Sequence, residues 1–251
     1  SPVKKHLKKN KIRKYRIILE PFKKNTAPAI LSSSLIGEIP DKQPLIFFTS
    51  DNLIKKVQIF NKSISSYKKH LTQDNIFIFG IKPKSPSSEY GYFLTKKFLN
   101  KYDKVFKFIE KPNTKKVKLI IKKKGYMNAG MFYLRKDSLI KNFKKYQKNI
   151  YNNCFKSVKN AKKREKVYYL NKVFFKKLNE ISFDYAILEK SKDINGIKLN
   201  IPFDDLGNWK EIWKFFKKNK SKSFIKKNTF KRPWGKYINL FYGKNFLLKE
   251  L

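Results

Sequence analysis

Two continuous apolar runs on either side of an amphipathic segment limit the fold of this chain more than any other feature. Residues 44–49 (PLIFFT) and 75–81 (NIFIFGI) read as strands buried on both faces of a sheet. Between them, apolar residues recur in steps of four and three from Leu53 to Leu71, which predicts a helix with one buried face. Strand, helix and strand in this order predict a βαβ unit with two parallel strands and a right-handed crossover. The sequence therefore predicts an α/β fold.

Other segments extend this pattern along the chain. Asn25 and Thr26 are helix-capping residues, and a helix is predicted directly after them with Pro28 in its first turn. Ser182 is predicted to cap another helix, SFDYAILEK. The first fourteen residues are basic and show no pattern. The remaining predictions are strands at 15–19 and 196–203 and helices at 139–151, 154–163 and 209–216.

The stretch from Phe106 to Phe132 carries the most informative polar residues. A short apolar strand leads to Glu110 and Lys111, and Pro112 ends it. A carboxylate beside an ammonium can bind a sugar phosphate, because one accepts from hydroxyls while the other faces the phosphate. After a lysine-rich spacer, GYMNAGMF offers Asn128 as donor and acceptor and then enters a second buried strand. Spacing alone favours a plainer interpretation, in which two strands are joined by a charged turn.

The formal net charge of +43 at first suggests a polyanionic partner. However, lysine is spread over the whole chain and occurs with abundant Asn, Ile, Phe and Tyr, which share A/T-rich codons. Codon bias and a solvated lysine surface therefore explain the charge without a specific nucleic-acid partner. Non-specific, salt-sensitive binding to nucleic acid is still expected.

Cysteine and histidine are too scarce for several kinds of site. Cys154 is the only cysteine, so an intrachain disulfide and a thiolate metal site are excluded. Two histidines cannot build a zinc cluster. No apolar run approaches the ~20 residues that cross a membrane, and no secretory signal begins the sequence. We therefore expect the cytoplasm and no membrane partner.

Two aspartates follow predicted buried strands. Asp51 comes after the run at 44–49, and Asp205 comes after the strand at 196–203 and directly follows Asp204. Ligands of open α/β sheets bind outside the carboxyl ends of the strands, and two carboxylates there can share a Mg²⁺ ion with substrate phosphates. For Asp51 taken alone, the pattern favours a helix cap over a metal ligand.

The sequence contains seven motifs in this order: LEPFKKNTAPAI, TSD, FGIKPKSPSSEYGY, FIEKP, GYMNAGMF, SFDYAILEKS and FDDLGNW. Taken together, they resemble those of bacterial mannose-1-phosphate guanylyltransferases in order and spacing. The resemblance covers roughly Leu19 to Leu251. In the bifunctional members of the family, a cupin-type mannose-6-phosphate isomerase domain follows, and the segment KRPWGKY resembles the start of that domain. The resemblance implies a three-layer, Rossmann-like nucleotidyltransferase fold with a mostly parallel mixed sheet, followed by the start of a β-rich cupin-type segment.

The resemblance also implies roles for individual residues. Glu20, Asn25 and Thr26 match the loop that holds the nucleotide base. Asp51 and Asp205 match the metal-binding aspartates, and with Lys111 they are the predicted catalytic residues. The sugar-phosphate pocket is matched by Gly91, Glu110, Lys111 and Asn128.

The implied reaction transfers GMP from GTP to mannose 1-phosphate and gives GDP-mannose, a precursor for polysaccharides, with release of pyrophosphate. Mg²⁺ is the implied cofactor, GTP and mannose 1-phosphate are the partners, and the sequence leaves a homodimer open. The implied domains are a nucleotidyltransferase domain over 1–218, a linker over 219–230 and the start of an isomerase domain over 231–251.

One departure from the family concerns the triphosphate. The family carries a glycine-rich loop with an arginine after its first strand, whereas the first glycine here is Gly37. Without that loop, backbone donors for the β- and γ-phosphates are missing. We therefore expect a truncated record of an active enzyme, with little activity in the chain as written. The alternatives are a non-catalytic sugar-nucleotide-binding relic and, third, a basic nucleic-acid-binding protein.

Overall fold

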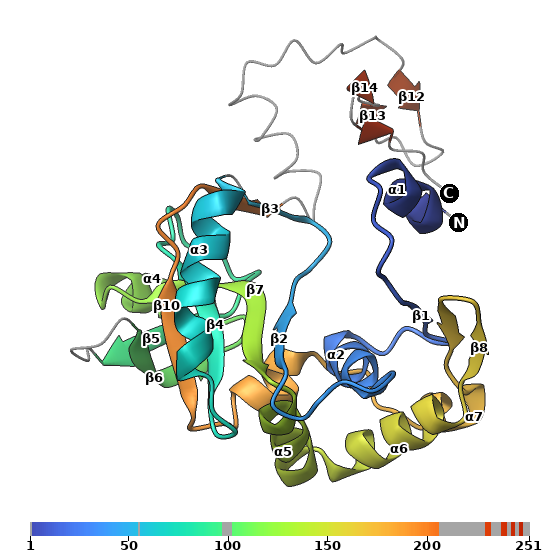
Figure 1. Cartoon of the computed structure of the whole chain (residues 1–251). Helices are drawn as coiled ribbons and strands as arrows, with labels where there is room; N and C mark the ends of the chain where they lie inside the picture. The colour runs from blue at the N-terminus through green and yellow to red at the C-terminus, as the bar shows by residue number, and fades with distance from the viewer. Residues whose placement is uncertain are drawn as a thin grey trace. The chain divides into compact units, whose positions relative to one another are not determined.

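The computed structural model in Figure 1 describes residues 2–54, 56–96 and 102–205 and four short strands beyond them. The chain divides into two compact units, one formed by residues 1–49 and 58–200 and the other by residues 50–57 and 201–251. The four short strands are β12 (Thr229–Lys231), β13 (Tyr237–Asn239), β14 (Tyr242–Gly243) and β15 (Phe246–Leu247), which pair as β12–β13 and β14–β15.

A six-stranded mixed sheet forms the centre of the first unit, with the order β2-β7-β4-β10-β6-β5. The pairings show that β2, β4, β10 and β5 run in one direction while β7 and β6 run in the other. Among the described neighbours in this sheet, only β4 and β10 are parallel. The strands are β2 (Pro44–Phe47), β4 (Ile76–Ile81), β5 (Tyr92–Lys96), β6 (Asp103–Ile109), β7 (Tyr126–Arg135) and β10 (Ile194–Lys198).

Strand β4 shows why this sheet needs helices on both faces. Its residues alternate between the two faces, as the pleat requires. Phe77 and Phe79 pack against α3 (Val57–Tyr67), whereas Ile76 and Ile78 belong to the core cluster shared with α2, α5 and α6. All four side chains are fully buried. The result is three layers, which confirms the predicted α/β fold class, and Figure 1 shows α3 running along β4.

The helices of the opposite layer pack against one another as well as against the sheet. Helix α2 contacts α5 and α6, α6 contacts α7, and α5 contacts both β7 and η2. Helix α4 lies against β5. The bounds are α2 (Thr26–Leu35), α4 (Thr114–Lys122), α5 (Lys136–Tyr146), α6 (Lys148–Lys159), α7 (Lys172–Lys176) and the π-helix η2 (Asp184–Leu188), with the short 3-10 helix η1 (Lys68–His70) after α3.

A smaller sheet, of order β1-β9-β8, completes the first unit. Strand β1 (Ile17–Leu19) is parallel to β9 (Val167–Tyr169), and β8 (Lys162–Arg164) pairs with β9 in the antiparallel sense. Strand β1 confirms the strand predicted at 15–19. Helix α1 (Pro2–Lys9) was not predicted, although Val3 and Leu7 lie four residues apart and so share one face.

The predicted βαβ unit is correct in direction but wrong in detail. Strands β2 and β4 run the same way, but β7 lies between them. Strand β2 is only half-buried and pairs with β7 alone among the described strands, so PLIFFT is not buried on both faces. The helix begins at Val57 instead of Leu53, because Asn52–Ile54 form the strand β3.

The second unit contains an antiparallel pair of β3 and β11 (Phe203–Asp205). The strand predicted at 196–203 is therefore two strands, since β10 ends at Lys198 in the first unit. The predicted helix at 209–216 and almost all of the predicted linker at 219–230 lie outside the described residues. In the part of the chain that the structure describes, no helix is both long and apolar enough to cross a bilayer.

Candidate functional site

Three of the residues predicted for a sugar-phosphate pocket meet where β5, β6 and β7 adjoin. The backbone nitrogen of Asn128 in β7 donates to the carbonyl oxygen of Gly91 at 2.8 Å, just before β5 begins. Glu110 follows β6, and a Cβ atom built on Gly91 would lie only 2.5 Å from the Oε2 atom of Glu110 and 3.6 Å from the Cβ atom of Asn128. Gly91 thus leaves room for the Glu110 carboxyl group in this corner.

The environment of Glu110 makes its carboxyl group unusually weakly acidic. Burial is the main reason that its pKa rises to about 8, and the negative charge of Asp184 adds to the effect. Lys111 lowers this pKa and Glu189 raises it further, each by a smaller amount. At neutral pH the group is mostly protonated, so it offers one O–H donor in addition to acceptor oxygen.

Asn128 is buried, and its amide is held from both ends. Its Nδ2 atom donates to Oδ1 of Asp184 at 2.9 Å, while its Oδ1 atom accepts from the backbone nitrogen of Gly130 at 3.3 Å. Burial is the main reason that the pKa of Asp184 rises to about 6, and the hydrogen bond from Asn128 opposes this shift. Gly130 has φ of +67°, which the backbone there can adopt without strain because it lacks a Cβ atom.

Lys111 lies at a sharp turn on the rim of the same corner. It is exposed and has φ of +45°, a left-handed conformation that is uncommon for a residue with a side chain. On one side of it, the backbone nitrogen of Glu110 donates to Oε1 of Glu189 at 2.9 Å. On the other side, Pro112 is buried and Asn113 caps α4. The lysine-rich spacer predicted after Pro112 is therefore this helix.

Two acidic residues of this site were missed by the sequence reasoning. Asp184 and Glu189 lie in the segment SFDYAILEKS, which was predicted as a capped helix and matched as a family motif without a role for either acid. Ser182 does accept from the backbone nitrogen of Tyr185 at 3.3 Å, and the apolar residues predicted to face inward are buried. The sequence feature that could have revealed these two residues is a pair of acids that flanks buried residues of the motif.

The predicted nucleotide-base loop begins after β1 and leads into α2. Asn25 is the N-cap of α2, and its Oδ1 atom accepts from the backbone nitrogen of Thr26 at 2.8 Å. The hydroxyl oxygen of Thr26 accepts from the backbone nitrogen of Phe183 at 2.9 Å. Glu20 follows β1 directly, and desolvation of its carboxyl group raises its pKa. The structure thus confirms the predicted cap.

The two predicted metal ligands belong to the second unit. Asp51 is exposed and directly precedes Asn52, which pairs with Asp205 across the antiparallel strands β3 and β11. This pairing therefore brings the backbones of Asp51 and Asp205 close together. Asp205 was predicted to follow a strand at 196–203, but it is the last residue of the separate strand β11. Among the described residues, no group of three or more His, Cys, Asp or Glu side chains could hold a metal ion.

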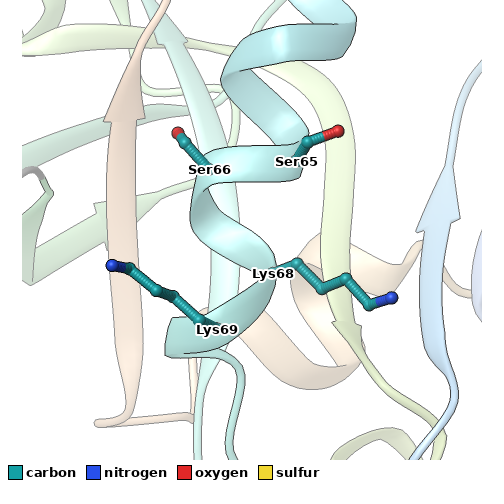
Figure 2. Close-up of a pocket in the computed structure, with 4 residues that line it drawn as sticks. All are labelled: Ser65, Ser66, Lys68 and Lys69. Atoms are coloured by element: carbon teal, nitrogen blue, oxygen red, sulfur yellow. The ribbon is translucent and has the colours of Figure 1, made fainter.

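The surface hollow in Figure 2 is a poor candidate for a binding site. Its lining comes from the end of α3 and from η1, and the side chains do not converge. Ser66 and Lys69 project to one side of the helix, while Ser65 and Lys68 project to the other. The corner around Glu110 and Asn128 has the convergent polar groups that this hollow lacks.

Comparison with known proteins identifies the family of this chain. The family model described as nucleotidyl transferase matches residues 1–222. A mannose-1-phosphate guanylyltransferase from Escherichia coli is 34% identical over 218 residues, which are 83% of this chain and 47% of that protein. The chain thus spans about half the length of the curated relatives that it matches.

Solved structures share the fold. The crystal structure of mannose-6-phosphate isomerase from Helicobacter pylori superposes with a TM-score of 0.71 and 29% identity, covering 79% of each chain. A structure described as mannose-1-phosphate geranyltransferase from Thermus thermophilus has a TM-score of 0.68 and 20% identity, covering 79% of this chain and 57% of that one. At that identity, the second similarity concerns the fold alone.

Proposed function

The chain belongs to the nucleotidyl transferase family, and we propose that it serves the transfer of GMP from GTP to mannose 1-phosphate. The products are GDP-mannose and pyrophosphate. Support comes from the relatives named mannose-1-phosphate guanylyltransferase and from the corner that Gly91, Glu110 and Asn128 form beside Lys111. We also propose that the reaction takes place in the cytoplasm. A homodimer stays a prediction.

The observation that carries this proposal is the meeting of Gly91, Glu110 and Asn128 in one corner. A hexose presents several hydroxyl groups that both donate and accept hydrogen bonds. Protonated Glu110 can donate to one hydroxyl, and the Asn128 amide has one N–H and one acceptor position left after its internal hydrogen bonds. Lys111, which is exposed on the rim, supplies a cation for the phosphate.

In the proposed reaction, an oxygen of mannose 1-phosphate attacks the α-phosphorus of GTP and pyrophosphate leaves. The pocket contributes by fixing the position of the sugar phosphate, since an oriented nucleophile reacts far faster than one in free solution. Lys111 also reduces the repulsion between the two anionic substrates. Glu20, Asn25 and Thr26 are proposed to hold the base.

Asp51 and Asp205 are proposed to hold Mg²⁺. Their donor set fits this ion, because Mg²⁺ prefers oxygen ligands and commonly takes only one or two carboxylates together with substrate phosphates. The pairing of Asn52 with Asp205 is the structural support. When bound, the ion would neutralise charge on the phosphates.

The direct test combines binding and turnover. Calorimetry should detect binding of GDP-mannose and of mannose 1-phosphate to the protein. In a protein extended at its start by the family's glycine-rich loop, an assay with GTP, mannose 1-phosphate and Mg²⁺ should detect pyrophosphate. Binding without turnover would favour the non-catalytic relic. No binding of either sugar ligand, together with tight binding of nucleic acid at physiological salt, would overturn the proposal.

The metal role can be tested with neighbouring aspartates. In the protein extended by the glycine-rich loop, Asp205→Asn should abolish Mg²⁺-dependent turnover while leaving thermal unfolding unchanged. Asp204→Asn is the matched control, because it removes the same charge from the adjacent residue of β11. Full turnover by Asp205→Asn, or equal losses in both variants, would refute the role of Asp205.

A further inference from the structure

Two acidic side chains of one short segment each hold a different residue of the sugar-phosphate pocket. Asp184 accepts from the Asn128 amide at 2.9 Å, and Glu189 accepts from the backbone nitrogen of Glu110 at 2.9 Å. The two acids lie at the start and just after the end of the π-helix η2. Neither acid is part of the binding of the sugar phosphate proposed for this pocket.

The π-helix explains how both acids can reach the same pocket. Five residues along an ordinary α-helix cover about 1.4 turns, which would direct the first and last side chains to different sides. In a π-helix the bond runs between residues five apart, and here the backbone nitrogen of Glu189 donates to the carbonyl oxygen of Asp184 at 3.0 Å. This wider turn brings Asp184 and Glu189 to one side of the segment.

The segment itself is firmly anchored. Phe183, Ala186, Ile187 and Leu188 are all buried in the main core cluster. The ring of Phe183 lies 4.7 Å from that of Phe132 in β7, measured between centroids. A side chain that projects from such a segment has a well-defined position, which is what a supporting residue needs.

We propose that Asp184 and Glu189 are positioning residues that hold Asn128 and Glu110 in the orientation that binds the hexose. The inference rests on the proposed function, because it assumes that this pocket takes mannose 1-phosphate. It does not require either acid to contact the substrate.

Asp184 determines which way the Asn128 amide points. An ionised carboxylate only accepts, so the nitrogen end of the amide must face Asp184. The donor nitrogen of Gly130 lies at the other end and requires the oxygen there. The two contacts exclude the flipped amide, which leaves one fixed donor and one fixed acceptor for hydroxyl groups.

Glu189 acts on the backbone. It binds the nitrogen of Glu110 immediately before Lys111, whose left-handed φ of +45° is costly without support. The contact therefore holds the turn that presents the Glu110 carboxyl group on one side and the Lys111 ammonium on the other.

The first test changes Asp184 and measures mannose 1-phosphate binding by calorimetry. Asp184→Ala should weaken binding about tenfold, as expected when a charge-assisted hydrogen bond is lost, while GTP affinity stays unchanged. Asp184→Asn should restore most of the affinity, because an amide oxygen can still accept from Asn128. In an Asn128→Ala background, Asp184→Ala should cause no further loss. Glu180→Ala, at an exposed acid before the segment, is the control and should bind normally.

The second test changes Glu189 in the same way. Glu189→Ala should weaken mannose 1-phosphate binding severalfold, and Glu189→Gln should restore it because the amide oxygen still accepts from the Glu110 nitrogen. Thermal unfolding of each variant separates a loss of folding from a loss of positioning. Normal binding in both alanine variants would overturn the inference alone. Equal losses for GTP and mannose 1-phosphate would also overturn it, and an absence of mannose 1-phosphate binding in the unchanged protein would overturn the proposed function with it.

Discussion

The loop before α2 and the pocket beside β7 carry similar polar side chains but use them differently. In the loop, the oxygen of Asn25 accepts from the nitrogen of the next residue, and the hydroxyl oxygen of Thr26 accepts from Phe183. These bonds begin a helix and tie it to its neighbour. In the pocket, Asn128 and Glu110 are held by two further acids, and both keep groups that can bind a ligand.

The two regions differ in what their hydrogen bonds and charges contribute to the stability of the empty protein. The loop's contacts stabilise the protein whether or not a ligand exists. The pocket gathers Glu110, Asp184 and Glu189 beside Lys111. Burial, together with repulsion among these acids, raises the pKa of Glu110 and of Asp184, although Lys111 opposes both shifts. Holding such groups together costs free energy in the empty protein. Clusters of this kind are found preferentially at functional sites. Changes in the pocket should therefore affect mannose 1-phosphate binding, whereas changes to the loop's capping contacts should affect stability. The base-binding role proposed for the loop concerns GTP, not the sugar phosphate.

The largest effect is expected for Lys111. Lys111→Ala should weaken mannose 1-phosphate binding about 10- to 100-fold, because a charge-assisted contact to phosphate is lost. GTP affinity should change much less, and calorimetry measures both. Lys24→Ala, in the loop before α2, removes the same charge and should leave mannose 1-phosphate binding unchanged. Equal losses in the two variants would show that overall positive charge, and not the pocket, attracts the sugar phosphate.

A smaller loss is expected when Gly91 receives a methyl group. Gly91→Ala would place that methyl 2.5 Å from Oε2 of Glu110, which can move because it ends a flexible side chain. We expect about a tenfold weaker affinity for mannose 1-phosphate and little change in the unfolding temperature. Gly80→Ala makes the matched contrast, since its methyl would lie 2.4 Å from Cζ of the buried Phe93 ring.

Gly80→Ala should lower the unfolding temperature by several degrees and change mannose 1-phosphate affinity little, because overpacking a core typically costs about 1–3 kcal/mol. If Gly91→Ala destabilises the protein as much as Gly80→Ala, then Glu110 is fixed by the fold and does not belong to an adaptable pocket.

Much of the fold could be predicted because its signals are local. The capped helix at Asn25, the buried strand β4 and the strand leading to Glu110 each follow from a short pattern of residue types. The order of the strands in the sheet, in contrast, depends on residues that are far apart in the sequence. That β7 lies between β2 and β4 depends on how residues 126–135 return to the sheet, and no feature of the intervening pattern specifies it.

The candidate site divides in the same way. Gly91, Glu110, Lys111 and Asn128 could be named because they stand in recognisable motifs, and three of them do meet. Asp184 and Glu189 could not be assigned, since an α-helical reading of their segment sends them to different sides. The π-turn that aligns them arises from packing of the buried residues between them, which sequence periodicity does not reveal.

The pocket should also respond to pH. The pKa of Glu110 is raised to about 8 by burial and by Asp184 and Glu189, against the opposing effect of Lys111. Protonated Glu110 is neutral, so mannose 1-phosphate should bind progressively more weakly as pH rises above about 8 and the carboxylate repels the phosphate. Glu110→Gln mimics the protonated group and should give a flat profile in this range. The same profile in both proteins would assign the titration to another group.

Linkage gives this pKa a second consequence. The folded protein holds the Glu110 proton more tightly than the unfolded chain does, so the free energy of unfolding should fall as pH rises from about 4.5 to about 8. The difference between unchanged protein and Glu110→Gln, followed by denaturant unfolding across this range, isolates the contribution. A difference that grows in the opposite direction would contradict the burial of the carboxyl group.

The smallest effect tests the loop side of the comparison. Asn25 has φ of +67° and ψ of −172°, a region that is essentially limited to glycine, and its side chain caps α2. Asn25→Ala should therefore lower the free energy of unfolding by about 1–2 kcal/mol. Asn25→Gly loses the cap but relieves the backbone, so it should cost only a few tenths of a kcal/mol. Mannose 1-phosphate affinity should be unchanged in both, because the capping oxygen serves the helix. A loss of that affinity in Asn25→Gly, where the fold is spared, would mean that the loop and the pocket act as one site and that the distinction between them fails.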